Sequence, residues 1–148
     1  MAKKFSIESK VKTQAQIKKI TKALKKDNKK IAFTNGCFDI LHYGHIKYLE
    51  EAKHMADVLV VGLNSDSSVR KIKGATRPIN SEFTRARVLS ALSFVDYVTI
   101  FRDETPIKVI ELITPDVLIK GGDWKISNIA GSGFVKAYGG KVVTIPYL

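Results

Sequence analysis

The sequence predicts an α/β domain built on a doubly wound parallel sheet of about five strands. Short apolar runs recur along the chain, and the segments between them carry apolar residues at helical spacing. The run at 57–63 (DVLVVGL) is almost continuously apolar, which is typical of a central parallel strand buried on both faces. Strands that alternate with helices form a parallel sheet through right-handed crossovers. The 148 residues suffice for one such domain with a substantial core.

An amphipathic helix over 14–27 is the first expected element. The sequence TQAQ at 13–16 resembles a capping box at its start. Ile17, Ile20 and Leu24 then share one apolar face, which predicts a helix that packs on the domain.

Strands and helices alternate through the middle of the chain. The first strand breaks at Asn35-Gly36, the next helix starts just after Gly44, and Asn80 or Ser81 caps a later helix. The expected elements are a strand over 30–34, a helix to about Met55, a strand over 57–63, a polar loop over 64–80 and a helix whose Val88, Leu89 and Leu92 face inward.

The last third of the chain continues the same alternation. Thr105 is expected to cap a helix that has Pro106 at its first position. The remaining elements expected are a strand over 95–101, a helix to about Thr114, a strand over 117–119, a helix ending at Gly139-Gly140 and a strand over Lys141–Ile145. If the strands lie in the order 3-2-1-4-5, the turns after the first and fourth strands meet in one crevice at the topological switch point.

The turn after the first strand carries two histidines. His42 and His45 stand where a strand gives way to a helix, and the free N–H groups and dipole of a helix start attract anions. Gly44 between them permits close approach of a ligand to the backbone. Two imidazoles at such a corner indicate a site for a phosphate whose charge grows during reaction.

Other interpretations of this turn are weaker. A closed zinc site lacks ligands, because His54 is the only other histidine and Cys37 the only thiol. Purely structural histidines remain an alternative. Cys37 is interpreted as a small packed residue rather than a nucleophile. Neither a GxxxxGK loop nor a GxGxxG fingerprint occurs in the sequence.

Two further segments could bind phosphate. Lys71 and Lys73 lie in the polar loop with Arg70 and Arg77, where they could neutralise a triphosphate or simply be solvated. The KGGD sequence at 120–123 ends the fourth strand, and its two glycines allow a ligand near the backbone. Arg85, on the helix that follows the polar loop, either binds the ligand or is a surface arginine.

The charge of +11 lies mostly at the N-terminus. Residues 1–30 hold 11 of the 25 basic residues with only Glu8 and Asp27 as acids. We therefore expect a basic arm and helix over 1–27 and a catalytic domain over 28–148. A nucleic-acid-binding module is the alternative of a different class, but Phe5 is the only aromatic residue among these lysines.

The sequence also bears on location. No apolar run is long enough to span a membrane, and the first residues contain no signal-peptide core. A single cysteine fits a reducing compartment. We expect a cytoplasmic protein without membrane association.

Together these residues resemble the cytidylyltransferase-like nucleotidyltransferases over nearly all of 28–148. HxGH at 42–45 is the signature of that superfamily. KGGD at 120–123 followed by IAG at 129–131 narrows the resemblance to the heptose 1-phosphate adenylyltransferase branch, a domain of bifunctional heptose kinase/adenylyltransferases. The resemblance also includes the segments NSDS at 64–67, Lys73-Gly74, Arg77-Pro78, Arg85 and Val95-Asp96.

The resemblance implies a Rossmann-like nucleotidyltransferase fold and transfer of AMP from ATP to D-glycero-β-D-manno-heptose 1-phosphate, giving ADP-heptose and pyrophosphate for lipopolysaccharide or another surface glycan. Mg²⁺ would enter with the triphosphate, no specific nucleic acid would bind, and the chain would form a homodimer. The family usually continues beyond Pro146-Tyr147-Leu148 into a Ser/Thr-rich turn and a final helix, so truncation is expected here. A cytidylyltransferase acting on glycerol 3-phosphate or a similar phosphorylated alcohol, and an inactive partner protein, remain alternatives.

The resemblance also assigns the site residues. His42, His45, Lys71 and Lys73 are expected to carry catalysis. The nucleotide is expected to contact Thr34, Asn35, Gly36, Phe38, Asp39, His42, Gly44, His45, Arg85, Lys120, Gly121, Gly122 and Asp123.

Overall fold

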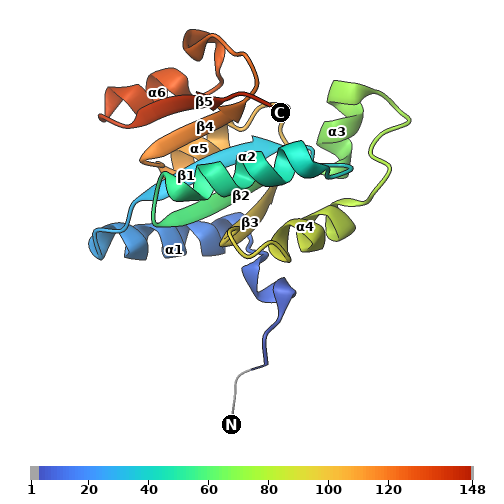
Figure 1. Ribbon diagram of the computed structural model, residues 1–148, viewed down its shortest axis with the longest axis horizontal. Helices are drawn as coiled ribbons and strands as arrows, with labels where there is room; N and C mark the ends of the chain where they lie inside the picture. Colours follow the sequence, from blue (N-terminus) through green and yellow to red (C-terminus); the bar gives the residue numbers. More distant parts are fainter. Residues whose placement is uncertain (1–3, 148) are drawn as a thin grey trace.

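A parallel sheet in the strand order β3-β2-β1-β4-β5 forms the centre of the molecule (Figure 1). The computed structural model describes residues 4–147. The strands are β1 (Ile31–Gly36), β2 (Val58–Asn64), β3 (Tyr97–Phe101), β4 (Val117–Gly121) and β5 (Lys141–Ile145). Both the predicted α/β class and the predicted strand order are confirmed.

Helices cover both faces of the sheet, because successive residues of a strand point to opposite sides. On one face, Ala32 and Val61 belong to a core with the helices α2 (Tyr43–His54) and α4 (Glu82–Ser90). On the other face, Ile31 and Phe33 pack in a second core with the helices α1 (Gln14–Lys26), α5 (Ile107–Ile113) and α6 (Ser132–Ala137).

Several element ends differ from the sequence expectation by one or two residues. β1 continues through Asn35-Gly36, because these residues pair with Gly62 and Leu63 of β2. α2 starts at Tyr43, ahead of Gly44, since His42 caps it. The cap of α5 is Pro106, one residue beyond the expected Thr105.

The segment expected to be a polar loop contains a helix, so that prediction was wrong. α3 (Asp66–Lys73) starts where the Ser65 hydroxyl accepts the Ser68 N–H at 3.1 Å, and it ends at Gly74 with φ of 102°. The apolar pattern is too short to indicate a helix, because Val69 is the only apolar residue that α3 buries. Capping by Ser65 and termination by Gly74 are the signals that define it.

The helix after this segment begins where expected, but the face that it buries differs from the predicted one. Ser81 caps α4 and accepts the Thr84 N–H at 3.2 Å. Leu89 is buried, but Val88 is 47% exposed, so its predicted inward position was wrong. The buried face of α4 includes Arg85 and Leu89, which are four residues apart.

The N-terminal segment contacts the edge of the sheet. A short 3-10 helix η1 (Ile7–Lys10) precedes a parallel bridge from Val11 to Val98, and the Lys12 N–H donates to the Val98 carbonyl at 2.8 Å. The Lys10 ammonium donates to the carbonyls of Val95 at 2.8 Å and Leu92 at 3.1 Å. Residues 7–12 therefore lie against edge strand β3.

The first long helix follows the sequence expectation closely. The Thr13 hydroxyl accepts the Gln16 N–H, and the Gln16 side chain accepts the Thr13 N–H, which confirms the capping box. Ile17 is fully buried against the sheet, while Lys18, Lys19 and Lys22 are exposed. None of the helices over residues 4–147 has both the length and the apolar character that a bilayer span needs.

Candidate active site

Strands β1 and β4 pair only near their beginnings. The paired residues are Ala32 with Val117 and Phe33 with Leu118. Beyond them the Tyr48 hydroxyl of α2 bridges the two strands, because it hydrogen-bonds to the Thr34 hydroxyl and donates to the Ile119 carbonyl at 3.3 Å. The two strands thus leave an opening at their carboxyl ends, which is the predicted switch point.

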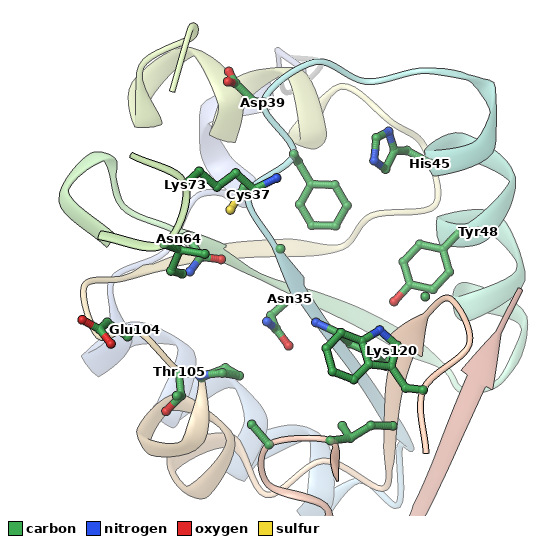
Figure 2. A pocket seen from close by; sticks show the side chains of 18 of the residues that line it. Asn35, Cys37, Asp39, His45, Tyr48, Asn64, Lys73, Glu104, Thr105 and Lys120 are labelled. Carbon is green, nitrogen blue, oxygen red and sulfur yellow. The ribbon is translucent and has the colours of Figure 1, made fainter. Parts of the chain in front are cut away.

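A cavity of about 790 Å³ lies over this opening (Figure 2). This volume is within the range of small-molecule sites, which is about 300–1,000 Å³. Its lining includes eight of the residues expected at the site, namely Asn35, Gly36, Phe38, Asp39, His45, Lys73, Lys120 and Gly121. The turns after β1 and β4 therefore meet in one crevice, as the strand order requires.

Both histidines help to cap α2, His42 as its N-cap and His45 from its first turn. His42 is the N-cap of α2, and its Nδ1 accepts the Gly44 N–H at 3.0 Å. His45 Nδ1 accepts the His42 N–H at 3.3 Å, and the two imidazole rings lie 4.0 Å apart. Because both Nδ1 atoms accept hydrogen bonds, each neutral imidazole carries its proton on Nε2. Each ring can then donate one Nε2–H hydrogen bond to an anion.

His45 is the histidine that lines the cavity. Burial lowers the pKa of His45 below its usual range, and the charges of His42 and Lys73 lower it further. At neutral pH the ring is therefore an uncharged donor. His42 is exposed and lies outside the lining, and Gly44 is buried in the first turn of the helix.

An aromatic residue fixes the turn between β1 and α2. Phe38 has a positive φ of 45°, and its ring meets the His45 ring edge-on at 5.8 Å. A Cβ at Gly36 would lie 2.9 Å from that ring, so this position requires glycine. The glycine therefore allows Phe38 to support His45.

Asp39 holds a neighbouring segment in place. Its carboxylate accepts the N–H groups of Ile79 and Asn80, both at 2.8 Å, and lies 3.5 Å from the Arg77 guanidinium. Partial burial alone would raise the pKa of Asp39, but these hydrogen bonds and Arg77 outweigh it and lower the pKa. Most of its hydrogen-bonding capacity serves the protein, although Asp39 also borders the cavity.

Arg85 lies beneath the site and not in its lining. It is 1% exposed, and its guanidinium donates to the carbonyls of Asn80, Cys37 and Asn64 at 2.8–2.9 Å. It also forms an ion pair with Asp66 at 2.8 Å. One buried side chain thereby joins the ends of β1 and β2 to the starts of α3 and α4.

Three cationic side chains border the cavity: Lys73, Arg77 and Lys120. Lys120 lies with its ammonium 5.0 Å from the centre of the Trp124 ring, and burial lowers the pKa of Lys120. Lys71, in the last turn of α3, is exposed and does not line the cavity. Of the two lysines expected to act in catalysis, only Lys73 therefore lies at the cavity.

Both glycines of the KGGD turn allow close packing, and Gly121 also lines the cavity. A Cβ at Gly121 would lie 2.9 Å from the Tyr147 ring, and Gly122 has φ of 100°. Gly122 also donates its N–H to the Ile145 carbonyl at 2.9 Å. Gly122 and the exposed Asp123 lie outside the cavity lining, as does the fully buried Thr34.

The cavity also contains residues that sequence reasoning missed. They are Tyr48 on α2, Asn64, Glu104 and Thr105 at the ends of β2 and β3, Trp124 and Asn128 after β4, and Tyr147 after β5. Apart from Asn64, which belongs to the NSDS match, the residues after the strands have position as their main sequence signal, because side chains after parallel strands gather at one edge. Cys37 also lines the cavity, and burial raises the pKa of its thiol, which fits the packed, unreactive interpretation.

A doubly wound parallel sheet whose switch-point cavity is bordered by lysines and an imidazole donor at a helix start is suited to bind the phosphates of a nucleotide. Comparison with known sequences gives the family. The cytidylyltransferase-like family profile matches residues 33–143, and the chain belongs to this family. The family predicted from HxGH and KGGD is thus confirmed.

Among characterised relatives, the chain is similar to the bifunctional protein HldE. It is 52% identical to that of Campylobacter jejuni strain RM1221 over 133 residues, which are 90% of this chain and 28% of the relative. The HldE of a Nitratiruptor species is 51% identical over 134 residues, or 90% of this chain and 29% of the relative. The chain therefore spans less than a third of the length of these relatives.

Two solved structures are similar to this chain in fold. The lipopolysaccharide core biosynthesis protein from Thermoplasma volcanium GSS1 superposes with a TM-score of 0.67 at 31% identity, over 81% of this chain and 97% of that one. The pantoate-beta-alanine ligase from Francisella tularensis has a TM-score of 0.64 at 20% identity, over 92% of this chain and 66% of that one. The second likeness shows the fold alone.

Proposed function

We propose that the chain transfers AMP from ATP to D-glycero-β-D-manno-heptose 1-phosphate and releases ADP-heptose and pyrophosphate. The observation that carries this proposal is the placement of His45, Lys73 and Lys120 around one switch-point cavity. The resemblance of 120–123 and 129–131 to heptose 1-phosphate adenylyltransferases supports the choice of substrates. Similarity to HldE and to a lipopolysaccharide core biosynthesis protein supports a role in surface-glycan synthesis.

The chemistry is one in-line displacement. An oxygen of the sugar phosphate attacks the α-phosphorus of ATP, a new P–O bond forms, and the bond to the bridging oxygen of the β-phosphate breaks. The second pKa of a phosphate monoester is about 6, so the nucleophile is largely dianionic at neutral pH and needs no general base. Catalysis then consists of positioning and charge stabilisation.

Each part of the site has a task in this scheme. The Nε2–H group of His45 donates to a phosphate oxygen as its charge grows, and His42, which is exposed outside the cavity lining, stays a prediction for the same role. Lys73 and Lys120 offset the charge of the phosphates. Arg85 acts through the segments that it joins, and Lys71 stays a prediction as a phosphate ligand.

The divalent cation is proposed to be Mg²⁺ and to arrive with ATP. Among residues 4–147, no three His, Cys, Asp or Glu side chains converge in a way that would hold a metal ion. Mg²⁺ prefers phosphate oxygens and water with only one or two protein carboxylates, so the donor set fits a cation held by the triphosphate. When bound, it neutralises the leaving pyrophosphate.

Pyrophosphate release tests the proposal. The four ribonucleoside triphosphates are each combined with heptose 1-phosphate, other sugar 1-phosphates and glycerol 3-phosphate. We expect the highest kcat/KM for ATP with heptose 1-phosphate. A preference for CTP with glycerol 3-phosphate would replace this function by the alternative cytidylyltransferase.

The alternative of a different class is nucleic-acid binding by the lysines of the N-terminal segment. We expect weak binding of DNA that disappears near physiological salt, since counterion release governs such contacts. Tight binding there, with no pyrophosphate release from any substrate pair, would contradict the enzyme assignment. The homodimer expected from the family is measured by light scattering of the same samples.

A further inference from the structure

One side of the cavity carries polar side chains that no phosphate requires. Asn64 lies at the end of β2, and Glu104 and Thr105 follow β3 (Figure 2). Figure 2 shows them across the cavity from His45, Tyr48 and Lys120, with Asn35 between the two sides. The ends of three adjacent strands, β1, β2 and β3, thus supply one polar cluster.

The cluster has unused hydrogen-bonding capacity. Asn64 is 3% exposed, and its Nδ2 donates to the Ser68 hydroxyl at 2.9 Å. Within residues 4–147, its Oδ1 and the side chains of Asn35, Glu104 and Thr105 have no hydrogen-bond partner. The Asn64 amide oxygen and the exposed Glu104 and Thr105 side chains are therefore free to bond to a ligand that enters the cavity.

The cluster is also built into the fold. The Ser68 hydroxyl that receives Asn64 donates in turn to the Asp103 carbonyl at 2.8 Å. The Ser65 N–H donates to the Phe101 carbonyl at 2.9 Å, so the chain leaving β3 is tied to the chain leaving β2. These bonds fix the backbone on either side of Arg102 and place Glu104 and Thr105 at the cavity.

The charge of Glu104 identifies the kind of ligand. The cavity is otherwise bordered by Lys73, Arg77 and Lys120, and the Asp39 carboxylate is occupied by backbone N–H groups. A free carboxylate repels phosphate oxygens, so Glu104 does not bind the triphosphate directly. A carboxylate is acceptor-only and can accept from two adjacent hydroxyls, and amide side chains both donate and accept. A carboxylate, an amide and a hydroxyl together suit a polyol.

We propose that Asn64, Glu104 and Thr105 hold the hydroxyls of the acceptor sugar, and that Glu104 determines specificity for a polyhydroxylated acceptor. This inference rests on the proposed function and adds which side of the cavity receives the sugar. The phosphate of the acceptor then points toward Lys73 and His45, and the nucleotide occupies the side of Lys120 and Trp124. A site built to hydrogen-bond hydroxyls discriminates strongly against ligands that lack them.

The test compares Glu104→Gln with Asp103→Asn. Both variants remove one negative charge from neighbouring positions, but Asp103 lies outside the cavity lining and is 3.9 Å from Lys108. Glu104→Gln should lower kcat/KM for heptose 1-phosphate about tenfold to a hundredfold, as expected for loss of hydrogen bonds to a charged group. The KM for ATP should change by less than about twofold, and the preference for heptose 1-phosphate over glycerol 3-phosphate should shrink. Asp103→Asn should behave like the wild type.

Two kinetic outcomes would overturn the inference. If Glu104→Gln raises the KM for ATP and shifts the Mg²⁺ dependence, Glu104 faces the cation and not the sugar. If Glu104→Gln and Asp103→Asn behave alike, the carboxylate does not contact the acceptor.

A binding measurement separates this inference from the proposed function. Calorimetry compares heptose 1-phosphate with inorganic phosphate on the wild type and on Glu104→Gln. We expect tighter binding of the sugar phosphate to the wild type and loss of that difference in the variant. If no substrate pair releases pyrophosphate but this difference is found, the proposed function fails and the sugar subsite stands. Equal binding of both probes to the wild type contradicts the subsite.

Discussion

At the scale of single residues, each histidine of the HxGH corner uses its two nitrogens for different tasks. Nδ1 caps α2, and Nε2–H is left to donate to a phosphate. Replacing His45 by Ala removes both. Replacing it by Asn retains an acceptor near the Nδ1 position and removes only the distal donor. The pair of variants therefore separates the structural role from the chemical one.

Both His45→Ala and His45→Asn should lower kcat about 10²-fold or more, as does loss of an oxyanion donor in other enzymes. Only His45→Ala should also lower the midpoint of urea unfolding. His54→Ala is the control, because His54 is exposed at the last residue of α2. Turnover near that of the wild type in a folded His45→Asn protein would remove His45 from the mechanism.

The lowered pKa of His45 predicts a pH dependence. Burial disfavours the imidazolium, and His42 and Lys73 add to this, so the folded pKa lies below the ordinary 6.5. The unfolded chain therefore binds the proton more readily, and the stability that neutral His45 contributes is full above pH 6.5 and is lost as pH falls through the folded pKa. We expect the acid limb of kcat/KM to have its midpoint below 6.5. The stability difference between the wild type and His45→Ala should shrink over the same range. A midpoint above 6.5 would contradict the neutral donor.

Arg85 predicts a large loss of stability. Replacing it by Met leaves three carbonyls and the Asp66 carboxylate without their buried partner. Removing one partner of a buried ion pair costs about 3–5 kcal/mol, and we expect about 3 kcal/mol here because Asp66 is partly exposed. Urea unfolding measures this loss. Arg70→Met, on the exposed surface of α3, should change stability by less than about 0.5 kcal/mol.

Some site residues were predictable from sequence because a local rule identifies them. His45 and Gly36 lie in one short motif, and Lys120 lies near the end of β4, so strand order brings them together. Tyr48, Glu104 and Tyr147 carry no local signal, because they become neighbours only after the sheet forms. Arg85 was expected as a ligand or a surface residue, and its buried position follows from the rotation of α4.

At the scale of elements, residues 7–12 act as a cover for edge strand β3. Lys10→Met removes the ammonium that bonds two carbonyls and should lower stability by about 1 kcal/mol, or the melting temperature by about 2–4 °C. Lys18→Met removes the same charge from the exposed face of α1 and is the control. Both variants should keep the turnover of the wild type. Equal melting temperatures would show that the contact of Lys10 contributes nothing.

The elements differ in how well the sequence predicts them. α1 and β5 follow their patterns, because a capping box and a run of β-branched residues define them locally. α3 was missed, since it buries one apolar residue and is held by capping and by reciprocal bonds between Asp66 and Glu82. β1 is longer than expected because pairing with β2 overrides the turn tendency of Asn35-Gly36.

At the scale of the whole molecule, strand order places the site. The chain adds β2 and β3 on one side of β1 and then adds β4 and β5 on its other side. The helices that follow β1 and β4 therefore lie on opposite faces of the sheet, and a cavity remains between the ends of these two strands. Cations border this cavity, while the larger excess of lysine lies on η1 and α1, away from it. The position of each charge therefore distinguishes the cavity from the N-terminal segment, which the net charge alone does not.

The cavity is proposed to join the α-phosphorus of ATP to a sugar phosphate, and labelled ATP follows that bond directly. Two parallel reactions with heptose 1-phosphate use α-labelled and γ-labelled ATP. We expect the α label in the sugar nucleotide and the γ label in pyrophosphate, in equal amounts and only when the acceptor is present. Transfer of the γ label to the sugar, or release of labelled AMP without an acceptor, would contradict this chemistry.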